Sequence, residues 1–209
     1  MNDPQFTNPA YRIETQRLVL RCYQPTDGPL LAESITESLE HLRPWMSWAH
    51  AEPEPLEEKI QRVKRFRGEF DLGQNFIYGI FNPEETKLIG GTGLHPRLGS
   101  EELEIGYWIH KDFINRGLVT EATAALVRVA FEIVRVHRVE IHCDPENFAS
   151  AAIPRKLGFT HEGTLRANMH FLDRWRDTMI WGLLESEYPD SPSAQAKIKI
   201  FDAAGRQAL

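Results

Sequence analysis

The chain has 209 residues and a formal net charge of −6, and 42% of its residues are hydrophobic and 26% charged. These values predict an ordinary globular protein of one domain, with or without an appendage, and the negative charge argues against nonspecific nucleic-acid binding as its main role. No apolar run of about eighteen residues predicts a membrane span, and the first residues lack the basic and apolar regions of a signal peptide.

The cysteine content indicates the compartment. Cys22 and Cys143 are the only two cysteines, and they form no spacing typical of a metal site. Two free thiols are most simply explained by a reducing environment. We therefore expect a cytoplasmic protein that binds no metal.

The first third of the chain is predicted to be a strand followed by two helices. Residues Met1 to Tyr11 form a loose lead-in, and Ile13 to Tyr23 alternates like a strand. A helical apolar stripe then runs from Leu30 to Leu42, and Pro44 ends that helix. A second helical stripe begins after Pro55.

Two tryptophans, Trp45 and Trp48, lie between the two predicted helices. Large rings in such a segment usually form a packed wall. The alternative is that they line a substrate pocket, because aromatic side chains are common in the walls of binding sites. We keep both residues as substrate-binding candidates.

The middle of the chain predicts a mixed sheet. Three period-two segments, joined by short turns, run from Asn75 to Ile80, from Lys87 to Pro96 and from Glu102 to Ile109, and they predict an antiparallel meander. A helix from Leu118 to about Val134 then leads to a strand from Arg138 to Cys143. A strand, helix, strand order calls for a right-handed parallel crossover.

The last part of the domain is predicted to hold a short helix and two strands. Asn147 can cap a helix from Phe148 to Lys156, which Gly158 ends. Strands follow near Thr160 to Arg166 and Met169 to Leu184, around a turn at Asp173 and Arg174. We expect one α/β (α+β) domain over residues 1–188, with a mixed, mostly antiparallel twisted sheet flanked by helices. Residues 189–209 are expected to be a linker and a tail that frays or adds a strand or helix.

The junction between the strand ending at Ile109 and the helix beginning at Leu118 predicts an anion site. The first backbone N–H groups of a helix have no internal partner, and the helix dipole adds partial positive charge there. Gly117 lets a ligand approach the backbone because it has no Cβ. The loop has neither the Gly-Lys-Ser/Thr end of a P-loop nor the glycines of a Rossmann motif.

Five sequence motifs together resemble one enzyme superfamily. Asn147-Phe-Ala-Ser150 followed by Lys156-Leu-Gly-Phe159 resembles the signature of GNAT N-acetyltransferases, and within them the RimJ/RimL branch, named for enzymes that acetylate ribosomal-protein N-termini. The other matching segments, in chain order, are Thr15 to Arg21, His41 to Trp48, Gly106 to Ile109 and Gly117 to Ala122. The resemblance spans roughly Ile13 to Leu184, and it implies the GNAT fold.

The resemblance implies direct transfer of acetyl from acetyl-CoA to a primary amine in a ternary complex, without a metal. It places the cofactor between the central strand, the loop and the Asn147 helix. The cofactor-binding residues that it implies are Tyr107, Trp108, Ile109, Asn115, Arg116, Gly117, Leu118, Val119, Thr120, Asn147 and Lys156. Ile114 and Val119 depart from the Gln/Arg and Gly/Ala of the family loop, but backbone N–H groups bind the phosphates there and any residue supplies them.

The catalytic assignments are Ser150 as the acid that protonates the CoA sulfur and Glu104 as the base. The structural alternative for Ser150 is a hydroxyl that bonds within its own helix, and that for Glu104 is a strand-edge salt bridge. RimL-type enzymes carry a glutamate beyond the Gly-Phe motif, where this chain has Asn168 or Met169. The rival bases are His95, His110 and Glu102.

The expected acceptor is a protein or peptide N-terminal α-amine, such as that of a ribosomal protein. An α-amine with a pKa near 7.7–8.0 is roughly a quarter neutral around pH 7.4, whereas a lysine near 10.4 is only about 0.1% neutral. A site without a strong base therefore suits the α-amine. The alternatives are a small-molecule amine (polyamine, antibiotic or metabolite), a longer acyl group, and a catalytically silent CoA-binding sensor. A homodimer stays open, whereas membrane and nucleic-acid partners are not expected.

Overall fold

The computed structural model describes residues 10–99 and 101–208, so the expected lead-in falls almost wholly outside the described residues. Nine of the described strands form one sheet in the order β7-β8-β6-β5-β4-β3-β2-β1-β9. The strands are β1 Arg12–Glu14, β2 Val19–Cys22, β3 Phe76–Phe81, β4 Leu88–Gly99, β5 Glu102–Ile109, β6 Arg138–Cys143, β7 Thr160–Phe171, β8 Arg174–Leu184 and β9 Lys199–Phe201. The α-helices are α1 Gly28–Leu42, α2 Leu56–Asp71, α3 Leu118–Val129 and α4 Phe148–Lys156.

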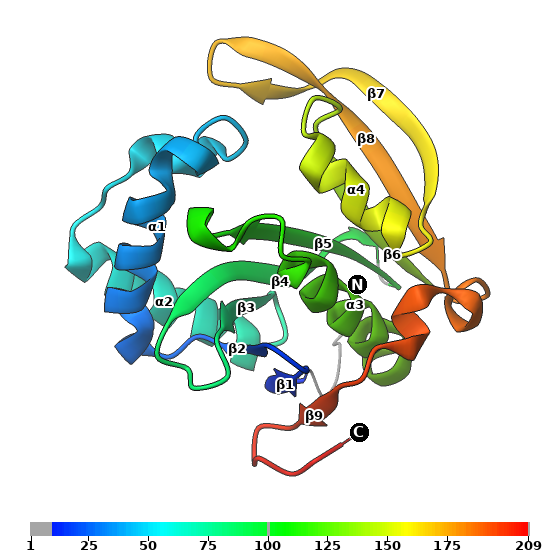
Figure 1. Ribbon diagram of the computed structural model, residues 1–209, viewed down its shortest axis with the longest axis horizontal. Helices are drawn as coiled ribbons and strands as arrows, with labels where there is room; N and C mark the ends of the chain where they lie inside the picture. Colours follow the sequence, from blue (N-terminus) through cyan, green and yellow to red (C-terminus); the bar gives the residue numbers. More distant parts are fainter. Residues whose placement is uncertain (1–9, 100, 209) are drawn as a thin grey trace.

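The helices cover both faces of the sheet, with α1 and α2 on one side and α3 and α4 on the other (Figure 1). Alternation along each strand explains this arrangement, because successive side chains point to opposite faces. Val19 packs in the smaller core beneath α1 and α2, and Leu20 packs in the larger core beneath α3 and α4. Among the described strands, β5 and β6 pair parallel and the others pair antiparallel. The predicted mixed, mostly antiparallel sheet flanked by helices is confirmed.

Helix α3 continues into a π-helical turn, Ala130–Val134, so the helix expected to end near Val134 is present over its full predicted length. In the described chain, no helix combines the length and the apolar character needed to cross a bilayer.

The expected single strand from Ile13 to Tyr23 is wrong, because a turn divides it into β1 and β2, which pair antiparallel. The Thr15 side chain makes the turn: its Oγ1 accepts a hydrogen bond from the Leu18 backbone N–H at 3.0 Å. The Thr15 N–H also donates to the Leu18 carbonyl at 2.9 Å. Gln16 and Arg17 lie exposed at the tip.

The expected end of the first of the last two long strands at Arg166 is also wrong, whereas the turn expected at Asp173 and Arg174 is present. Strand β7 continues to Phe171 through a bulge, where its register against β8 shifts between Leu165 and Met169. Ala167 takes a positive φ of 46° at the bulge, and its N–H donates to Asp177 Oδ1 at 2.8 Å. The two strands form a long hairpin that extends above the sheet (Figure 1).

The segment after residue 188 packs on the domain. Strand β9 pairs antiparallel with β1, and Ile200 is buried in the larger core. The tail therefore adds an edge strand, which is one of the outcomes that the sequence left open.

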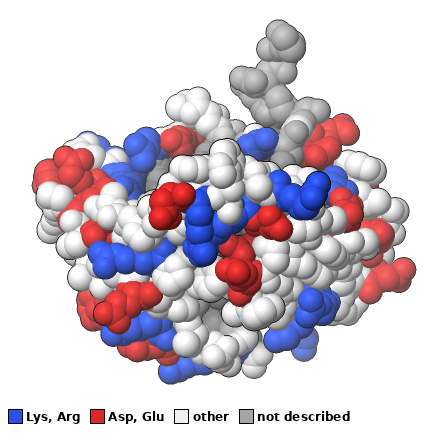
Figure 2. Space-filling model, turned by 90° about the horizontal axis from the view of Figure 1, so that it is seen from above, with Lys and Arg blue, Asp and Glu red and all other residues white. Residues whose placement is uncertain are grey.

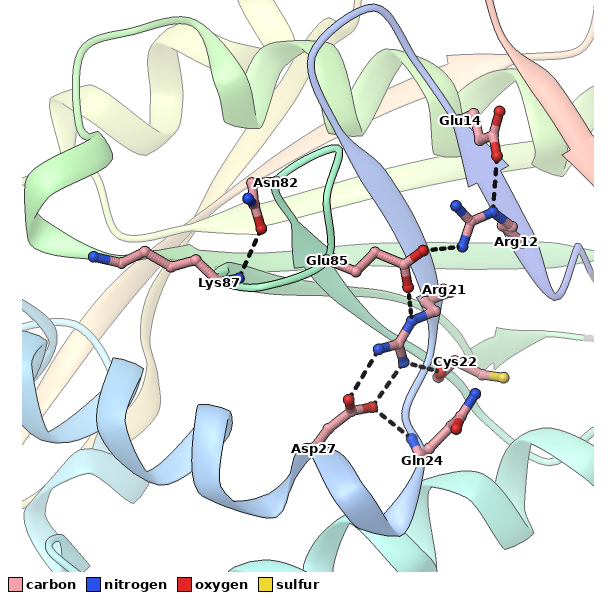
Figure 3. A network of polar contacts seen from close by, with 9 residues as sticks. All are labelled: Arg12, Glu14, Arg21, Cys22, Gln24, Asp27, Asn82, Glu85 and Lys87. Carbon is pink, nitrogen blue, oxygen red and sulfur yellow. Dashed lines mark hydrogen bonds and ion pairs between the residues drawn. The ribbon is translucent and has the colours of Figure 1, made fainter.

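A charged network fixes the N-terminal strands to the start of α1 (Figure 3). Glu85, in the turn between β3 and β4, accepts hydrogen bonds at 2.5 Å from Arg12 and from Arg21. Arg21 also binds both oxygens of Asp27 at 2.7 and 2.9 Å, and its guanidinium lies 4.0 Å from the Phe81 ring centroid. These contacts hold β1, β2 and the entry of α1 in one arrangement.

Candidate active site

The central feature of the site is a gap between β5 and β6. Their parallel pairing covers three residue pairs and ends at Glu104 opposite Glu140. Beyond that point β5 continues along β4 and β6 continues along β8, so the β6-facing edge of β5 has no partner strand in the described chain. A cavity of about 820 Å³ lies at this gap, between the sheet, α1, α2, α4 and the β7–β8 hairpin.

One wall of the cavity carries a hydroxyl pair from β5 and α4. Asn147 is the N-cap of α4, and its Oδ1 accepts a hydrogen bond from the Ser150 N–H at 3.0 Å. Ser150 Oγ donates to the Tyr107 hydroxyl at 3.2 Å, which donates to the Ser150 carbonyl at 3.1 Å. Burial raises the pKa of Tyr107 above its ordinary value, so that hydroxyl stays protonated. The serine hydroxyl is thus presented to the cavity in one defined place.

Cys143 ends β6 in the same wall, at a position that no sequence pattern indicated as functional. Burial raises the pKa of its thiol, so it is a neutral, poorly nucleophilic group at physiological pH. Cys143 and Cys22 are both free and buried.

Glu104 lies on the other side of the gap, on the β5 face that points toward α1 and α2. Its side chain is only 11% exposed, and Arg97 binds both carboxylate oxygens, at 2.5 and 2.7 Å. A bidentate guanidinium occupies one lone pair on each carboxylate oxygen, so a proton must come to one of the lone pairs that remain. The arrangement combines the two expected alternatives, a cavity carboxylate and a salt bridge.

His142 is a titratable residue that the sequence reasoning missed. Its Nε2 lies 2.5 Å from Glu140 Oε2, and its Nδ1 lies 3.8 Å from Glu104 Oε2. A neutral ring that donates through Nε2 to Glu140 keeps its Nδ1 lone pair free on the side of Glu104. Strand alternation in β6 predicts that Glu140 and His142 lie on the same face. It does not predict that His142 lies beside Glu104, which belongs to another strand.

The rival bases lie in different surroundings. His95 lines the cavity, with Nδ1 2.7 Å from Asn75 Oδ1. Burial lowers the pKa of His95 to about 4, so its ring is neutral near pH 7. His110 and Glu102 do not line the cavity.

His110 itself is fully buried just after β5, whereas its partners Glu37 and Asp112 are exposed. Its Nε2 lies 2.8 Å from Glu37 Oε2, and its Nδ1 accepts the Asp112 N–H at 3.1 Å. Ligand atoms of these three residues lie within 4.8 Å of one another. Because the N–H of Asp112 occupies the Nδ1 lone pair and Nε2 faces a carboxylate, the contact is complete without an ion.

The tryptophans of the α1–α2 segment form the far wall. Trp45 and Trp48 both line the cavity, and Trp48 packs edge-to-face on Trp108 with ring centroids 6.1 Å apart. Trp108 in turn lies over Gly91, where a Cβ would come within 2.4 Å of the indole Nε1. The glycines of β4 therefore make room for side chains of β5, and Trp48 combines packing with a cavity surface.

The β7–β8 hairpin closes the mouth of the cavity. Arg176 lies 3.8 Å from the Phe171 ring centroid, and its Nη1 donates to the Pro44 carbonyl at 2.8 Å and to Asp144 Oδ2 at 3.1 Å. This side chain connects the hairpin with the α1–α2 segment and with the end of β6. Asn168 and Met169, at the position of the expected glutamate, also line the cavity and neither is a base.

The predicted anion site lies beside this cavity, at the start of α3. Gly117 occupies the N-cap position with φ of 71° and ψ of 7°, a left-handed conformation that favours glycine. Leu118, Val119 and Thr120 form the first turn of α3, whose N–H groups have no partner within the helix. Asn115 takes a positive φ of 57°, which turns the loop toward the helix.

The remaining predicted cofactor residues are spread along the same side of the molecule. The guanidinium of Arg116 lies 5.2 Å from the Phe113 ring centroid at the surface of the loop. Ile109 ends β5 just before the loop. Lys156 lies exposed in the last turn of α4, at the opposite end of the helix from Asn147. The loop and Asn147 thus flank the gap, whereas Lys156 is not brought to it.

Charge on the surrounding surface is mixed. On the face drawn in Figure 2, basic and acidic side chains are interspersed over the surface. A field of one sign, as needed for strong nonspecific binding of a polyanion, is not present on that face.

Comparison with known proteins agrees with this geometry. Residues 17–160 match the sequence profile of the family described as acetyltransferase (GNAT) domain. A ribosomal protein uS5 alanine N-acetyltransferase of Escherichia coli (strain K12) is 26% identical over 185 residues, which cover 86% of this chain and 94% of that protein.

Two solved structures share the fold. The RimL ribosomal L7/L12 α-N-protein acetyltransferase in complex with coenzyme A superposes with a TM-score of 0.73 at 22% identity, covering 81% of this chain and 95% of that one. The microcin C7 self-immunity acetyltransferase MccE, in complex with acetyl-CoA and AMP, gives 0.75 at 20% identity, covering 81% and 93%. At these identities the likeness concerns the fold alone.

Proposed function

The chain belongs to the GNAT acetyltransferase domain family and is an acetyl-CoA-dependent acyltransferase, and from that premise we propose that it acetylates the N-terminal α-amine of a protein or peptide. The observation that carries the proposal is the Glu104 carboxylate, which Arg97 holds through both oxygens. Because the Glu104 carboxylate is bound to Arg97, the site suits an acceptor amine that is already partly neutral near pH 7. An α-amine near pKa 7.7–8.0 meets that condition, and a lysine near 10.4 does not. The uS5 alanine N-acetyltransferase relative supports the same acceptor class.

Acetyl-CoA fits the gap between β5 and β6. The open N-terminus of α3, with Gly117, suits the pyrophosphate, because free N–H groups and the helix dipole attract phosphate oxygens. The unpaired edge of β5 at Tyr107 to Ile109 suits the amides of the pantetheine arm, as a sheet edge accepts an added strand. An N–H group on the same edge would polarise the thioester carbonyl. Asn147 lies on the other side of the gap, where its Oδ1 caps α4 and its side-chain NH2 group can donate to the arm.

The transfer is a single displacement at the thioester carbonyl. The neutral amine nitrogen attacks the carbonyl carbon, the carbon–sulfur bond breaks, and CoA leaves as a thiolate. Ser150 Oγ donates a proton to the departing sulfur and is reprotonated from solvent. The ammonium proton passes to the pair formed by Glu104 and His142, directly or through a water, and from there to solvent. The two proton positions belong to different elements, because Ser150 lies on α4 whereas Glu104 and His142 lie on β5 and β6.

An acceptor panel that follows CoA release tests the proposal. The panel holds peptides with a free N-terminal alanine or serine, the same peptides with a blocked N-terminus and an internal lysine, spermidine, and an aminoglycoside. We expect release with the free N-terminal peptides, and a mass increase at the terminus by tandem mass spectrometry. CoA release with only spermidine or the aminoglycoside would show that the acceptor is a small-molecule amine and not a peptide α-amine. Acetyl-CoA binding without any turnover would favour the sensor alternative.

Glu104→Gln is the companion variant for the base. If Glu104 receives the proton, the variant should lose activity near neutral pH and recover it at high pH, where the amine loses its proton unaided. His142→Gln at the same pH values separates the two members of the pair. Equal pH profiles for wild type and both variants would contradict this assignment.

A further inference from the structure

Arg17, at the tip of the turn between β1 and β2, reaches across the molecule to the loop before α3. Its Nη1 donates to the Arg116 carbonyl at 3.0 Å, and its Nε donates to Glu121 Oε2 at 2.7 Å. Its backbone N–H donates to the other carboxylate oxygen of Glu121 at 3.0 Å. One side chain thus binds both the loop and the first turn of the helix that follows it.

Glu121 is held by the same turn from a second direction. Thr15 Oγ1 donates to Glu121 Oε1 at 2.6 Å, so the carboxylate meets four donor atoms from the β1–β2 turn. Its side chain is 20% exposed, and it lies in the first turn of α3, where the phosphates of acetyl-CoA are placed. An unneutralised carboxylate there would repel those phosphates.

The guanidinium of Arg17 also lies beside the point where a ligand would approach. Its Nη2 lies 3.7 Å from a Cβ built on Gly117 and is the nearest described atom that belongs to another segment of the chain. The contacts to Arg116 and Glu121 engage all three nitrogens, and a guanidinium carries five N–H groups, so some remain for a bound anion. The side chain is 47% exposed, which keeps those groups accessible.

We propose that Arg17 is a positioning residue for acetyl-CoA. It fixes the loop from Ile114 to Thr120 in its binding shape through the Arg116 carbonyl, and it neutralises Glu121 next to the phosphates. The inference rests on the proposed placement of the pyrophosphate at α3. Stability alone does not account for this contact, because a half-exposed ion pair contributes little to the free energy of unfolding.

The test compares two ligands, of which only one carries the pyrophosphate. Dissociation constants for CoA are measured by calorimetry and those for pantetheine, which lacks the nucleotide and all three phosphates of CoA, by ligand-observed NMR. Arg17→Met should weaken CoA binding about tenfold, the factor that corresponds to ~1.4 kcal/mol, and leave pantetheine binding unchanged. Arg17→Lys, which keeps the charge but cannot bind Arg116 and Glu121 together, should fall between wild type and Arg17→Met.

A double variant separates the two parts of the role. Arg17→Met with Glu121→Gln should bind CoA more tightly than Arg17→Met alone, because the uncompensated carboxylate is gone. The matched control is Arg67→Met, which removes a similarly exposed ion pair to Asp71 on α2 and touches neither the loop nor α3. It should leave both dissociation constants unchanged.

The outcomes separate failure of this inference from failure of the proposed placement. If wild type binds pantetheine as tightly as CoA, the pyrophosphate does not bind at α3 and the placement itself is wrong. If wild type prefers CoA and Arg17→Met keeps the full preference, Arg17 does not position the cofactor. An equal loss for both ligands, with a lowered melting temperature, would show a merely structural contact and would also overturn the inference.

Discussion

Ser150→Ala is the substitution that tests the catalytic acid most directly. The change removes one hydrogen bond, from Ser150 Oγ to the Tyr107 hydroxyl at 3.2 Å, and keeps the backbone bond from Ser150 N–H to Asn147. Losing one such neutral bond changes the free energy of unfolding by about 0.5–1.5 kcal/mol. For a chain of this size, ~1 kcal/mol corresponds to a melting shift of about 2–4 °C. The variant should therefore fold and bind acetyl-CoA.

The expected effect on catalysis is larger than the effect on stability. General acid catalysis contributes about 10²–10⁴-fold. A thiol leaving group has a pKa near that of cysteine, about 8.5, so the CoA thiolate leaves tolerably without a proton. We therefore expect kcat to fall about a hundredfold, at the low end of that range, with little change in acetyl-CoA affinity.

The assay is CoA release under saturating acetyl-CoA with the best acceptor peptide, supported by pre-steady-state traces that show whether chemistry limits the rate. Ser150→Thr keeps a hydroxyl at the same position and should recover most of the lost kcat. A Ser150→Ala variant with wild-type kcat, under conditions where chemistry limits, would refute the acid role. A collapse of acetyl-CoA affinity with kcat intact would make Ser150 a binding or capping residue instead.

Three further substitutions test other parts of the site. Gly117→Trp should abolish the acetyl-CoA-dependent rise in melting temperature, because it forces a bulky residue into φ of 71° at the anion site; an undiminished rise would contradict that site. Trp48→Ala should raise KM for the acceptor and leave acetyl-CoA affinity unchanged. It should also lower the free energy of unfolding by about 0.5–1.5 kcal/mol, because the contact with Trp108 is lost. Unchanged acceptor kinetics in a stable variant would count against the pocket role. Burial holds the pKa of His95 at about 4, below its ordinary 6.5, so the unfolded chain binds the extra proton and stability falls as pH drops from 6.5 toward 4. Urea titrations at pH 7 and pH 5 should show a loss of about 1–2 kcal/mol that His95→Gln removes, and an unaltered pH dependence would show that His95 does not cause it.

Local patterns in the sequence were sufficient for most of the elements around the site. The bounds predicted for β6 and α4 agree with the structure, and Asn147 caps α4 as expected. These features depend on neighbours within about four residues, because caps, helical stripes and strand alternation are set by nearby side chains and backbone groups. The strand-loop-helix junction at Gly117 also depends only on residues that are near in sequence.

Features that depend on distant segments were decided by the tertiary structure. Glu104 meets His142 because β5 and β6, separated by a whole helix, pair in parallel register up to that residue. Arg17 meets Glu121 across 104 positions of sequence, and no pattern in either segment indicates the other. The turn that divides Ile13 to Tyr23 was missed for a related reason, because β1 and β2 both alternate and only their pairing shows where the chain reverses.

The sequence by itself determined the order of most elements and the mixed sheet, since each leaves a periodic or capping pattern, and its family resemblance pointed to Tyr107, Asn147 and Ser150 at the β5–β6 gap. The tertiary structure decided which charges meet at that gap: Arg97 on Glu104, His142 beside it and Arg17 at the loop. The physical reason is that charge pairing acts over a few ångströms of space, and folding brings residues to that range without regard to their separation along the chain.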